Sequence, residues 1–420
     1  MMKTEKNSII LLAPAGSFES LHAALNNGAD AVYFGVGKLN MRSLGAVNFS
    51  AEDLPEIAEL CHRRNAKAWL ALNTVIFDSE MNEVDSLCRA AKDAGIDAVI
   101  AMDAAVISCA NKHGLPVHLS VQMSISNLEA VKFYAKSADV MVLARELKLE
   151  QIAAICKGIR EEHVTGPSGE LVKIEVFVHG ALCIAVSGKC GMSLASYNSS
   201  ANRGACYQNC RRKYTVRDTE TGTEFVIDNH YVMSPSDLCT VSILDRILET
   251  GVSVLKIEGR GRSADYTAKV TAVYREALDR WLDGKPFTRE ISEQWEKRLA
   301  KVFNRGFWNG GYYLGEKIGE WSRSADNQAT VRKIFAGTIR NYYPKAGIAE
   351  ILLSSAPLKT GSKVLVTGNT TGAVEFRIDS LRADDIPCEE APKGADATFP
   401  SPFKLRENDK LYLLEKNIQD

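Results

Sequence analysis

Five cysteines gather in one stretch of the chain, between residues 183 and 239. They are Cys183, Cys190, Cys206, Cys210 and Cys239. The other five cysteines are spread through predicted helices and the C-terminal part of the chain, where a cysteine usually acts as a small buried apolar residue. Glycines flank the gathered cysteines, which is typical of a loop. Because closely spaced loop cysteines in a reducing compartment commonly bind a metal or a cluster, we expect most of them to be ligands.

The spacing of these cysteines leaves two kinds of site open. Zinc sites are commonly built from close C-x2–4-C pairs. Here the intervening segments have six, fifteen, three and twenty-eight residues, and no C-x2-C pair occurs. Four thiolates that come from separated turns suit a [4Fe–4S] cluster at least as well. Zinc therefore remains the alternative cofactor to the [4Fe–4S] cluster.

The motifs of common hydrolases and nucleotide-binding proteins do not occur around the cysteines. Seven residues separate Gly180 from Gly188-Lys189, which is too many for a phosphate-binding P-loop. Ala185 stands where a G-x-S-x-G nucleophile elbow at Ser187 would need a glycine. The zinc-protease motif H-E-x-x-H occurs nowhere in the sequence. The sequence therefore offers no standard motif of hydrolysis.

Eight short apolar segments, separated by turns and amphipathic helical patterns, predict parallel βα units. The predicted strands are residues 9–12, 31–34, 66–72, 98–101, 117–121, 140–143, 174–178 and 254–257. Eight such units favour a (β/α)8 barrel of the TIM type over an open sheet. The segment after the seventh strand runs from His179 to about Gly251, far longer than a usual βα loop, and it carries all five gathered cysteines. Within it we expect a β-hairpin at residues 213–228 and a helix at residues 235–249.

Charged residues follow several of the predicted strands. Because the carboxyl ends of barrel strands converge on one mouth, these side chains should line a shared pocket that suits a carboxylate or a phosphate. The candidate substrate-binding residues are Lys256, Arg260, Arg262, Gln122, Arg42 and Arg211. The candidate catalytic residues are Glu175, Glu258 and Arg145. A solvated surface explains any single charged run equally well, so the pocket depends on the barrel prediction.

The chain changes character beyond the eighth predicted strand. Residues 1–285 form the predicted barrel, and residues 286–330 are predicted to be a helical extension or linker. Residues 331–420 show alternating apolar and polar positions broken by glycine and proline, which predicts a small all-β barrel.

Composition limits the partners and the compartment. The chain carries 51 Lys+Arg against 52 Asp+Glu, a formal net charge of −1. This balance argues against a broad basic surface and confines any nucleic-acid contact to a local patch. The first apolar run has the length of a strand, and no run approaches the ~20 apolar residues of a membrane span. We therefore expect a cytoplasmic protein without membrane attachment, in which thiols stay reduced.

The segment EVFVHGALCIAVSGKCGMS, residues 175–193, resembles the signature of the U32 "collagenase-like" peptidase family. Further similar segments are AVYFGVGKLNMR, NRGACYQNCRRKY, SPSDLC, KIEGR and NRGF. The C-terminal β domain also resembles the small barrel of that family. The resemblance therefore covers nearly the whole chain.

The resemblance implies a function other than the one in the family's name. Members include oxygen-independent hydroxylation factors that hold a [4Fe–4S] cluster on four cysteines and act on tRNA wobble uridine, ribosomal RNA cytidine or ubiquinone. Carried over to this chain, it implies Cys183, Cys190, Cys206 and Cys239 as ligands, with Cys210 as the substitute fourth ligand. The layout is most similar to the tRNA hydroxylation proteins. That similarity implies tRNA as a partner, prephenate as a co-substrate and a paralogous partner protein.

The sequence thus supports three hypotheses. The first is an iron–sulfur RNA-modifying enzyme that carries out prephenate-dependent 5-hydroxylation of the tRNA wobble uridine. The second is a U32-type peptidase, in which a cysteine or an acidic residue such as Glu175 or Glu258 activates the attack. The third is a zinc-stabilised scaffold that binds RNA or protein without catalysis.

Overall fold

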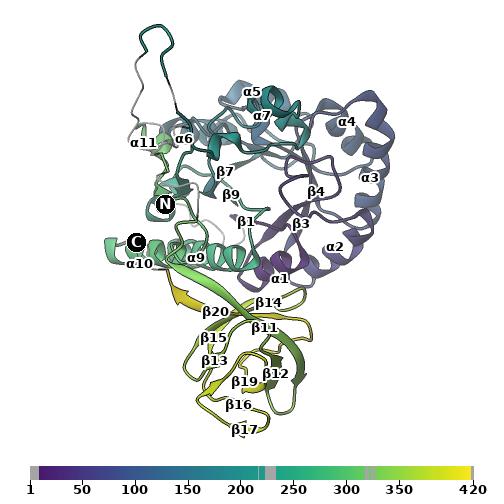
Figure 1. The fold of residues 1–420 in the computed structure, drawn as a ribbon. Coiled ribbons are helices and arrows are strands. Elements are labelled where there is room, and N and C mark those ends of the chain that lie inside the picture. Colours follow the sequence, from purple (N-terminus) through teal and green to yellow (C-terminus); the bar gives the residue numbers. More distant parts are fainter. Residues whose placement is uncertain (1–8, 216, 223–232, 317–320, 323–326, 418–420) are drawn as a thin grey trace.

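The computed structural model describes residues 9–215, 217–222, 233–316, 321–322 and 327–417. Its N-terminal part is a closed barrel of eight parallel strands (Figure 1). The strands are β1 (Ile10–Pro14), β2 (Ala31–Gly35), β3 (Lys67–Leu72), β4 (Ala98–Ala101), β5 (Val117–Leu119), β6 (Val140–Val142), β7 (Lys173–Gly180) and β9 (Val254–Ile257). Strand β9 pairs in parallel with both β1 and β7, which closes the barrel. The predicted (β/α)8 fold is therefore confirmed.

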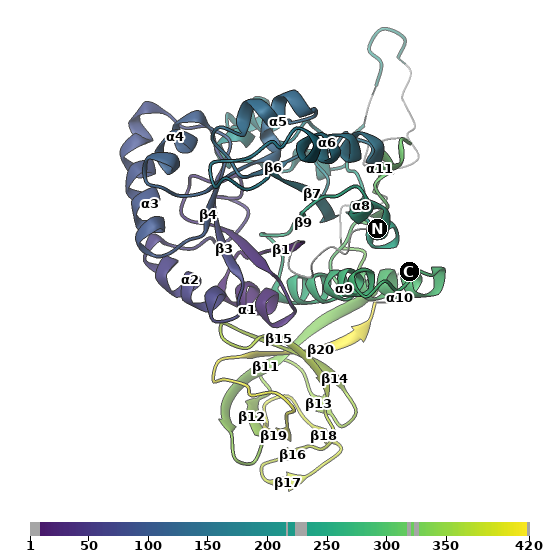
Figure 2. The same ribbon diagram turned by 180° about the vertical axis from the view of Figure 1, so that it is seen from behind.

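Helices cover the outside of the barrel (Figures 1 and 2). They are α1 (Phe18–Asn26), α2 (Leu54–His62), α3 (Met81–Asp93), α4 (Ala104–Lys112), α5 (Leu128–Tyr134), α6 (Leu149–Glu161), α8 (Leu244–Glu249), α9 (Ala264–Leu282) and α10 (Arg289–Leu299). Polar side chains start several of them, because a side-chain oxygen there accepts a hydrogen bond from an unpaired backbone N–H group. Ser17, Asp103 and Asn127 cap α1, α4 and α5 in this way. These caps set where the βα loops end at the mouth of the barrel.

The long segment between β7 and β9 contains one element that differs from the prediction. Residues 235–249 do not form a single helix, because Asp237–Cys239 is a strand, β8, and α8 begins only at Leu244. Strand β8 pairs antiparallel with the end of β7 and in parallel with β10 (Phe307–Trp308). In this pairing, backbone N–H and C=O groups of residues 237–239 form hydrogen bonds to neighbouring strands instead of hydrogen bonds within a helix. Of the predicted hairpin at residues 213–228, residues 216 and 223–228 lie outside the described residues.

Side chains from alternate strand positions fill the barrel interior. Leu12, Tyr33, Trp69, Ile100 and Val254 form one buried cluster there. His118 lies against Trp69, with ring centroids 4.2 Å apart and an edge-on arrangement. The interior is therefore a packed core, as in other barrels of this size, and leaves room for a ligand only above it, at the carboxyl ends of the strands.

The C-terminal part is an all-β unit with its own apolar core, as predicted. Its strands are β11 (Val331–Tyr343), β12 (Ile348–Leu352), β13 (Leu358–Lys359), β14 (Lys363–Gly368), β15 (Gly372–Arg377), β16 (Arg382–Ala383), β17 (Ile386–Pro387), β18 (Glu390–Ala391), β19 (Asp396–Pro400) and β20 (Lys410–Lys416). Ala336, Ile351 and Val366 are among the residues of this core. Strand β15 packs against α1 and α9, and Lys269 of α9 pairs with Glu375 at 2.8 Å. The β unit thus lies against the side of the barrel (Figure 2).

Among the described residues, no helix combines the length and the apolar character needed to cross a bilayer.

Candidate functional site

A cavity of about 220 Å³ opens at the carboxyl ends of the barrel strands. Its walls come from the ends of β2, β5, β7 and β9 and from the segment that follows β7. Four cysteines of that segment line it, namely Cys183, Cys190, Cys206 and Cys210. Three of them are partly buried, and Cys183 is exposed. The structure therefore brings four of the five gathered thiols around one space above the barrel.

The fifth gathered cysteine, Cys239, was predicted as a ligand but lies apart from the four cavity cysteines. Cys239 is only 2% exposed in β8 and is absent from the cavity wall. It packs in the main core and interacts with the Tyr274 hydroxyl group. Burial raises the pKa of its thiol to about 12. Cys210, the predicted substitute, takes the fourth position at the cavity instead.

Two arginines of the cysteine segment help to hold it in place. Arg211 donates to the backbone oxygens of Leu182 at 2.6 Å and of Pro235 at 2.5 Å. Arg203 forms two hydrogen bonds to the Glu80 carboxylate, at 2.6 and 2.7 Å, and does not line the cavity. Gly188 has a φ of +81°, and an added Cβ would lie 3.2 Å from the Gln122 amide nitrogen. These contacts and the left-handed backbone of Gly188 fix the conformation of a segment that has little regular secondary structure.

Seven cationic side chains line the same cavity. They are Arg42, Arg145, Arg211, Lys256, Arg260, Arg262 and Arg305. Among the described residues, Glu258 is the only carboxylate in the cavity wall. This excess of positive charge favours an anionic ligand such as a carboxylate, a phosphate or a thiolate-bound cluster. The prediction that charged strand ends share one mouth holds for Lys256, Glu258, Arg260 and Arg262.

Arg305 was not among the predicted site residues, although it lies in the NRGF segment that resembles the family. It is 6% exposed, and its Nη1 atom lies 3.4 Å from an Asp237 carboxylate oxygen. Its guanidinium and that of Arg262 both lie over the Phe303 ring, at 5.1 and 3.6 Å from the centroid. The aromatic ring partly compensates two neighbouring cations that have left water. The signal that points to Arg305 is its position in the family-like NRGF segment.

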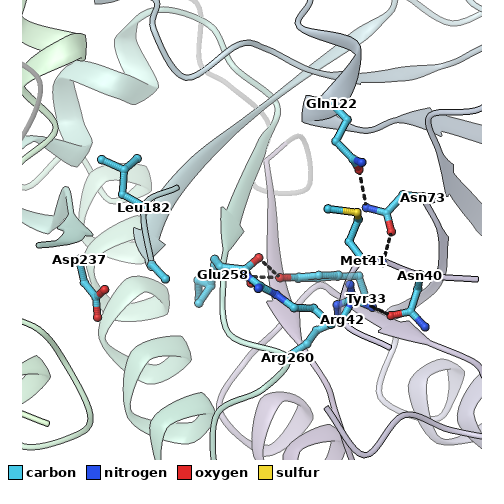
Figure 3. A network of polar contacts seen from close by, with 12 residues as sticks. Tyr33, Asn40, Met41, Arg42, Asn73, Gln122, Leu182, Asp237, Glu258 and Arg260 are labelled. Atoms are coloured by element: carbon cyan, nitrogen blue, oxygen red, sulfur yellow. Dashed lines mark hydrogen bonds and ion pairs between the residues drawn. The ribbon is translucent and has the colours of Figure 1, made fainter. Parts of the chain in front are cut away.

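Glu258 is a fixed carboxylate at the mouth (Figure 3). Two nitrogens of Arg42 donate to it at 2.8 and 3.2 Å, and the Tyr33 hydroxyl donates at 3.1 Å. Burial opposes its ionisation, but Arg42 and Arg260 outweigh this effect and lower its pKa to about 2. Glu258 is therefore ionised at neutral pH and suited to hold cations and orient a donor. It is poorly suited to release or take up a proton as a general acid or base.

Glu175 lies below the cavity and does not line it, which changes its predicted catalytic role. Its side chain is fully buried, and one carboxylate oxygen accepts from Lys256 at 2.7 Å. Lys256 does reach the cavity wall, and its ammonium group lies 4.6 Å from the centroid of the Tyr33 ring. Glu175 thus positions Lys256 and partly neutralises it. It does not touch the space in which a ligand would bind.

Neutral polar side chains complete the opposite wall. The Gln122 carbonyl oxygen accepts from Asn73 and Ser120, each at 3.0 Å, and Asn73 in turn accepts from the backbone N–H of Met41 (Figure 3). On another side, Asn40 accepts from Arg260 at 3.0 Å. These contacts tie the loop after β2 to β3 and β5. The predicted residue Gln122 is therefore at the site, held by neighbours rather than free to rotate.

Arg145 lies at the cavity wall, as expected from its place after β6. Its guanidinium lies 4.0 Å from the centroid of the Phe177 ring, and Nη1 donates to the Ala181 backbone oxygen at 3.3 Å. The Nε atom is buried and has no hydrogen-bond partner in the described part of the chain. Such an unpaired buried donor is costly, which is consistent with a site for an added acceptor.

The four cavity thiols fit a cluster better than a single zinc ion. Zinc holds thiolates at about 2.3 Å, so four ligand sulfurs would lie roughly 3.8 Å apart. Within the described ranges, one set of three potential ligands has all its ligand atoms within 4.8 Å of one another. That set is Asp85, Cys109 and His113, which lie far along the chain from these thiols. Burial raises the pKa of the Cys210 thiol, and the neighbouring Arg211 offsets only part of this rise. Four cysteines around a cationic space, no three of which bring their sulfurs within 4.8 Å of one another, suit a [4Fe–4S] cluster as donors.

Among the described residues that line the cavity, no nucleophilic side chain lies beside a histidine that could act as its base. Among the described residues no histidine lines it. His118 lies in the barrel interior and His179 is buried at the end of β7, and burial lowers the pKa of each to about 3. Ser193 lines the cavity, but its hydroxyl accepts from the Tyr207 backbone N–H at 3.0 Å. The described site therefore lacks the pair that would activate a serine or cysteine.

Comparison with known proteins shows the family to which the chain belongs. Residues 16–323 match peptidase family U32. A protein named collagenase from Porphyromonas gingivalis is 46% identical over 410 residues, covering 98% of this chain and 99% of that protein. The tRNA hydroxylation protein P1 of Bacillus subtilis is 33% identical over 79% of this chain and 77% of its own length. The 23S rRNA 5-hydroxycytidine C2501 synthase of Escherichia coli is 33% identical over 76% of this chain and 47% of its own length. This chain therefore belongs to peptidase family U32.

Proposed function

We propose that this chain is an iron–sulfur enzyme that hydroxylates RNA, with the wobble uridine of tRNA as its substrate. The observation that carries the proposal is the ring of four cysteines around a cavity with seven cations and, among the described residues, no histidine. The similarity to the tRNA hydroxylation protein and to the rRNA 5-hydroxycytidine synthase supports the reaction class.

In this proposal Cys183, Cys190, Cys206 and Cys210 hold a [4Fe–4S] cluster. When bound, such a cluster, held by four cysteines, supplies one-electron redox chemistry beside the substrate. The chain's own cations then have two tasks. They neutralise the anionic thiolate-bound cluster, and they hold an anionic co-substrate next to it. Arg145, Arg260 and Arg305 are the first candidates for that second contact, because each has a buried Nε without a hydrogen-bond partner among the described residues.

Hydroxylation replaces the hydrogen on C5 of uracil with a hydroxyl group and removes two electrons from the base. An oxygen-atom donor that is reduced by the same two electrons must therefore reach the cavity together with the RNA. A dicarboxylate such as prephenate suits the cationic wall formed by Lys256, Arg260 and Arg262 as a co-substrate. The target base must leave its stack to enter the cavity, as in other enzymes that modify bases.

A peptidase is the second candidate, because the collagenase of Porphyromonas gingivalis is 46% identical over nearly the whole chain. The site geometry argues against it. Glu258 is held ionised by Arg42, Glu175 is buried below the cavity, and the cavity thiols lack a histidine partner among the described residues. A metal-free preparation that cleaves denatured collagen, with loss of cleavage in Glu258→Gln, would favour the peptidase instead.

The ligand set is tested by purification without oxygen, with visible absorption and iron analysis. The wild type should be brown and contain about four irons for each chain. Cys210→Ser should lose most of the iron and the visible absorption, whereas Cys239→Ser should keep both. A colourless wild type with one zinc for each chain would contradict the proposal. Iron loss in Cys239→Ser but not in Cys210→Ser would restore the ligand set predicted from the sequence.

The substrate is tested separately, by nucleoside analysis of tRNA from a strain without the gene. Loss of 5-hydroxyuridine derivatives at the wobble position, restored by the wild-type gene and not by the Cys183→Ser variant, is the expected result. Unchanged wobble uridines together with an iron-containing protein would reject tRNA as the substrate and leave the cluster in place.

A further inference from the structure

The segment that carries the cavity cysteines is strongly basic in an otherwise balanced chain. Residues 181–217 contain six basic residues and no acidic residue, whereas the whole chain has a net charge of −1. The six are Lys189, Arg203, Arg211, Arg212, Lys213 and Arg217. Arg203 pairs with Glu80 and Arg211 braces the backbone, but Lys189 and Arg212 are exposed. This patch is where an anionic partner would approach the mouth.

Two exposed tyrosines lie together in the same segment. Tyr197 ends helix α7 (Met192–Tyr197), and Tyr207 lies in the loop that follows. They are 44% and 48% exposed, and their ring centroids are 4.9 Å apart with the planes inclined by 41°. Arg212 donates to the Tyr197 hydroxyl, and its guanidinium lies 5.3 Å from the centroid of that ring. Large rings that remain in water next to an arginine are typical of surfaces that stack nucleic-acid bases.

This tyrosine pair is connected rigidly to the cavity. The residues on either side of Tyr207, Cys206 and Gln208, both line the cavity. The Tyr207 backbone N–H donates to Ser193 of α7 at 3.0 Å. Asn209 donates to Ser196 of the same helix at 3.0 Å and also lines the cavity. The rings therefore stand at the rim: Tyr207 lies on the short stretch that supplies Cys206 and Cys210, and Tyr197 lies against it at the end of α7.

We propose that Tyr197, Tyr207 and Arg212 form a stacking platform for an unpaired nucleotide that flanks the one entering the cavity. The proposal rests on the proposed RNA substrate and adds where the strand is held. A base stacks on the exposed tyrosine faces, and the phosphates beside it contact Arg212 and Lys189. Stacking does not depend on base identity, so the platform holds the strand while the cavity selects the base.

An RNA strand fits this surface better than a protein partner does. A protein interface typically has apolar residues at its centre and few charges there. Here Arg212 lies over the Tyr197 ring, and no acidic residue occurs from position 181 to 217. Single-stranded RNA is the partner that combines a regular negative charge with flat, exposed aromatic faces.

The test is RNA binding by the full-length, iron-loaded protein, measured by fluorescence anisotropy. The probe is a labelled RNA hairpin whose loop contains unpaired uridine, and a fully paired RNA duplex of the same length is the comparison. The double variant Tyr197→Ala/Tyr207→Ala should bind the hairpin roughly 5-fold to 100-fold more weakly, as expected for loss of base stacking. The double variant Tyr197→Phe/Tyr207→Phe keeps the rings and should stay within about 2-fold of wild type.

Tyr343→Ala is the matched control, because Tyr343 is 45% exposed on β11, far along the chain from the mouth. It should bind like the wild type. Iron content and visible absorption must be equal in all variants, which separates loss of stacking from loss of the cluster. Equal hairpin binding by wild type and the alanine variant would overturn the platform while leaving the proposed function intact. A wild type that binds neither RNA would overturn both, and equal weakening for hairpin and duplex would overturn stacking as the cause.

Discussion

The floor and the mouth of the barrel both contain many polar groups, but they are built in different ways. The floor consists of Trp69, His118 and Glu175, together with Lys256, whose ammonium group also reaches the cavity wall; these residues are at most 5% exposed. They come from regular strands, and the charged pair is neutral as a whole. The mouth is formed by the cavity cysteines and arginines, on loops with left-handed residues such as Gln208. Its cations outnumber its carboxylates. The floor is thus a buried region that carries no net charge from its ion pair, whereas the mouth has an excess of cations that suits an added anionic group.

The largest expected effect is at the floor. Replacing Lys256 with Met leaves Glu175 as an unpaired buried charge, and one of its oxygens already has no partner in the described part of the chain. Breaking a buried pair on one side usually costs about 3–5 kcal/mol. We therefore expect Lys256→Met to lower the free energy of unfolding by about that amount in urea denaturation.

Two controls sharpen this result. The double variant Glu175→Gln/Lys256→Met removes the unpaired charge and should recover most of the loss. Lys269→Met makes the same change at the partly exposed pair with Glu375, where Lys363 remains, and should cost less than about 1 kcal/mol. Equal losses for Lys256→Met and Lys269→Met would contradict the distinction between floor and surface.

The next effect is the pH dependence of stability, to which His118 of the floor contributes. Burial, with a contribution from Lys256, lowers the pKa of His118 from 6.5 to about 3. The folded chain keeps this ring neutral, while the unfolded chain binds a proton below pH 6.5. Stability should therefore fall by about 1.4 kcal/mol per pH unit for this group as the pH drops from 6.5 toward 3. His118→Phe should remove that part of the slope.

The pKa of Glu258 at the mouth is also lowered, but by neighbouring arginines rather than by burial, and its effect on stability begins at a lower pH. Its pKa is lowered to about 2 from 4.5, so its contribution to stability is present above pH 4.5 and is lost only as the pH falls from 4.5 toward 2. Unfolding free energies of the iron-free wild type and of His118→Phe, measured at several pH values between 6.5 and 4.5, separate the two regions. Parallel slopes for the two proteins over this range would show that His118 takes up its proton in the folded state.

The sequence predicted the floor better than the mouth for a physical reason. A strand is a local pattern, and all eight barrel strands were recognised because apolar runs alternate with helical periodicity. The alternation along a strand also makes Glu175 an inward residue, but only the structure shows that Lys256 meets it below the cavity. Contacts between loops are not local. The spacing of Cys206, Cys210 and Cys239 does not reveal that residues 237–239 pair with β7 and β10.

The smallest effect compares Cys239 with Cys210 in the iron-free protein. Cys239→Ala removes a sulfur that is 2% exposed and interacts with Tyr274, and should cost about 1–2 kcal/mol in urea denaturation. Cys210→Ala changes a partly exposed residue at the cavity and should stay within about 0.5 kcal/mol. A thiol that the fold does not need, at a position that empties the site of iron when changed, is there for ligation. If Cys210→Ala is the more destabilising of the two without iron, its sulfur belongs to the packing and the comparison between floor and mouth fails at that residue.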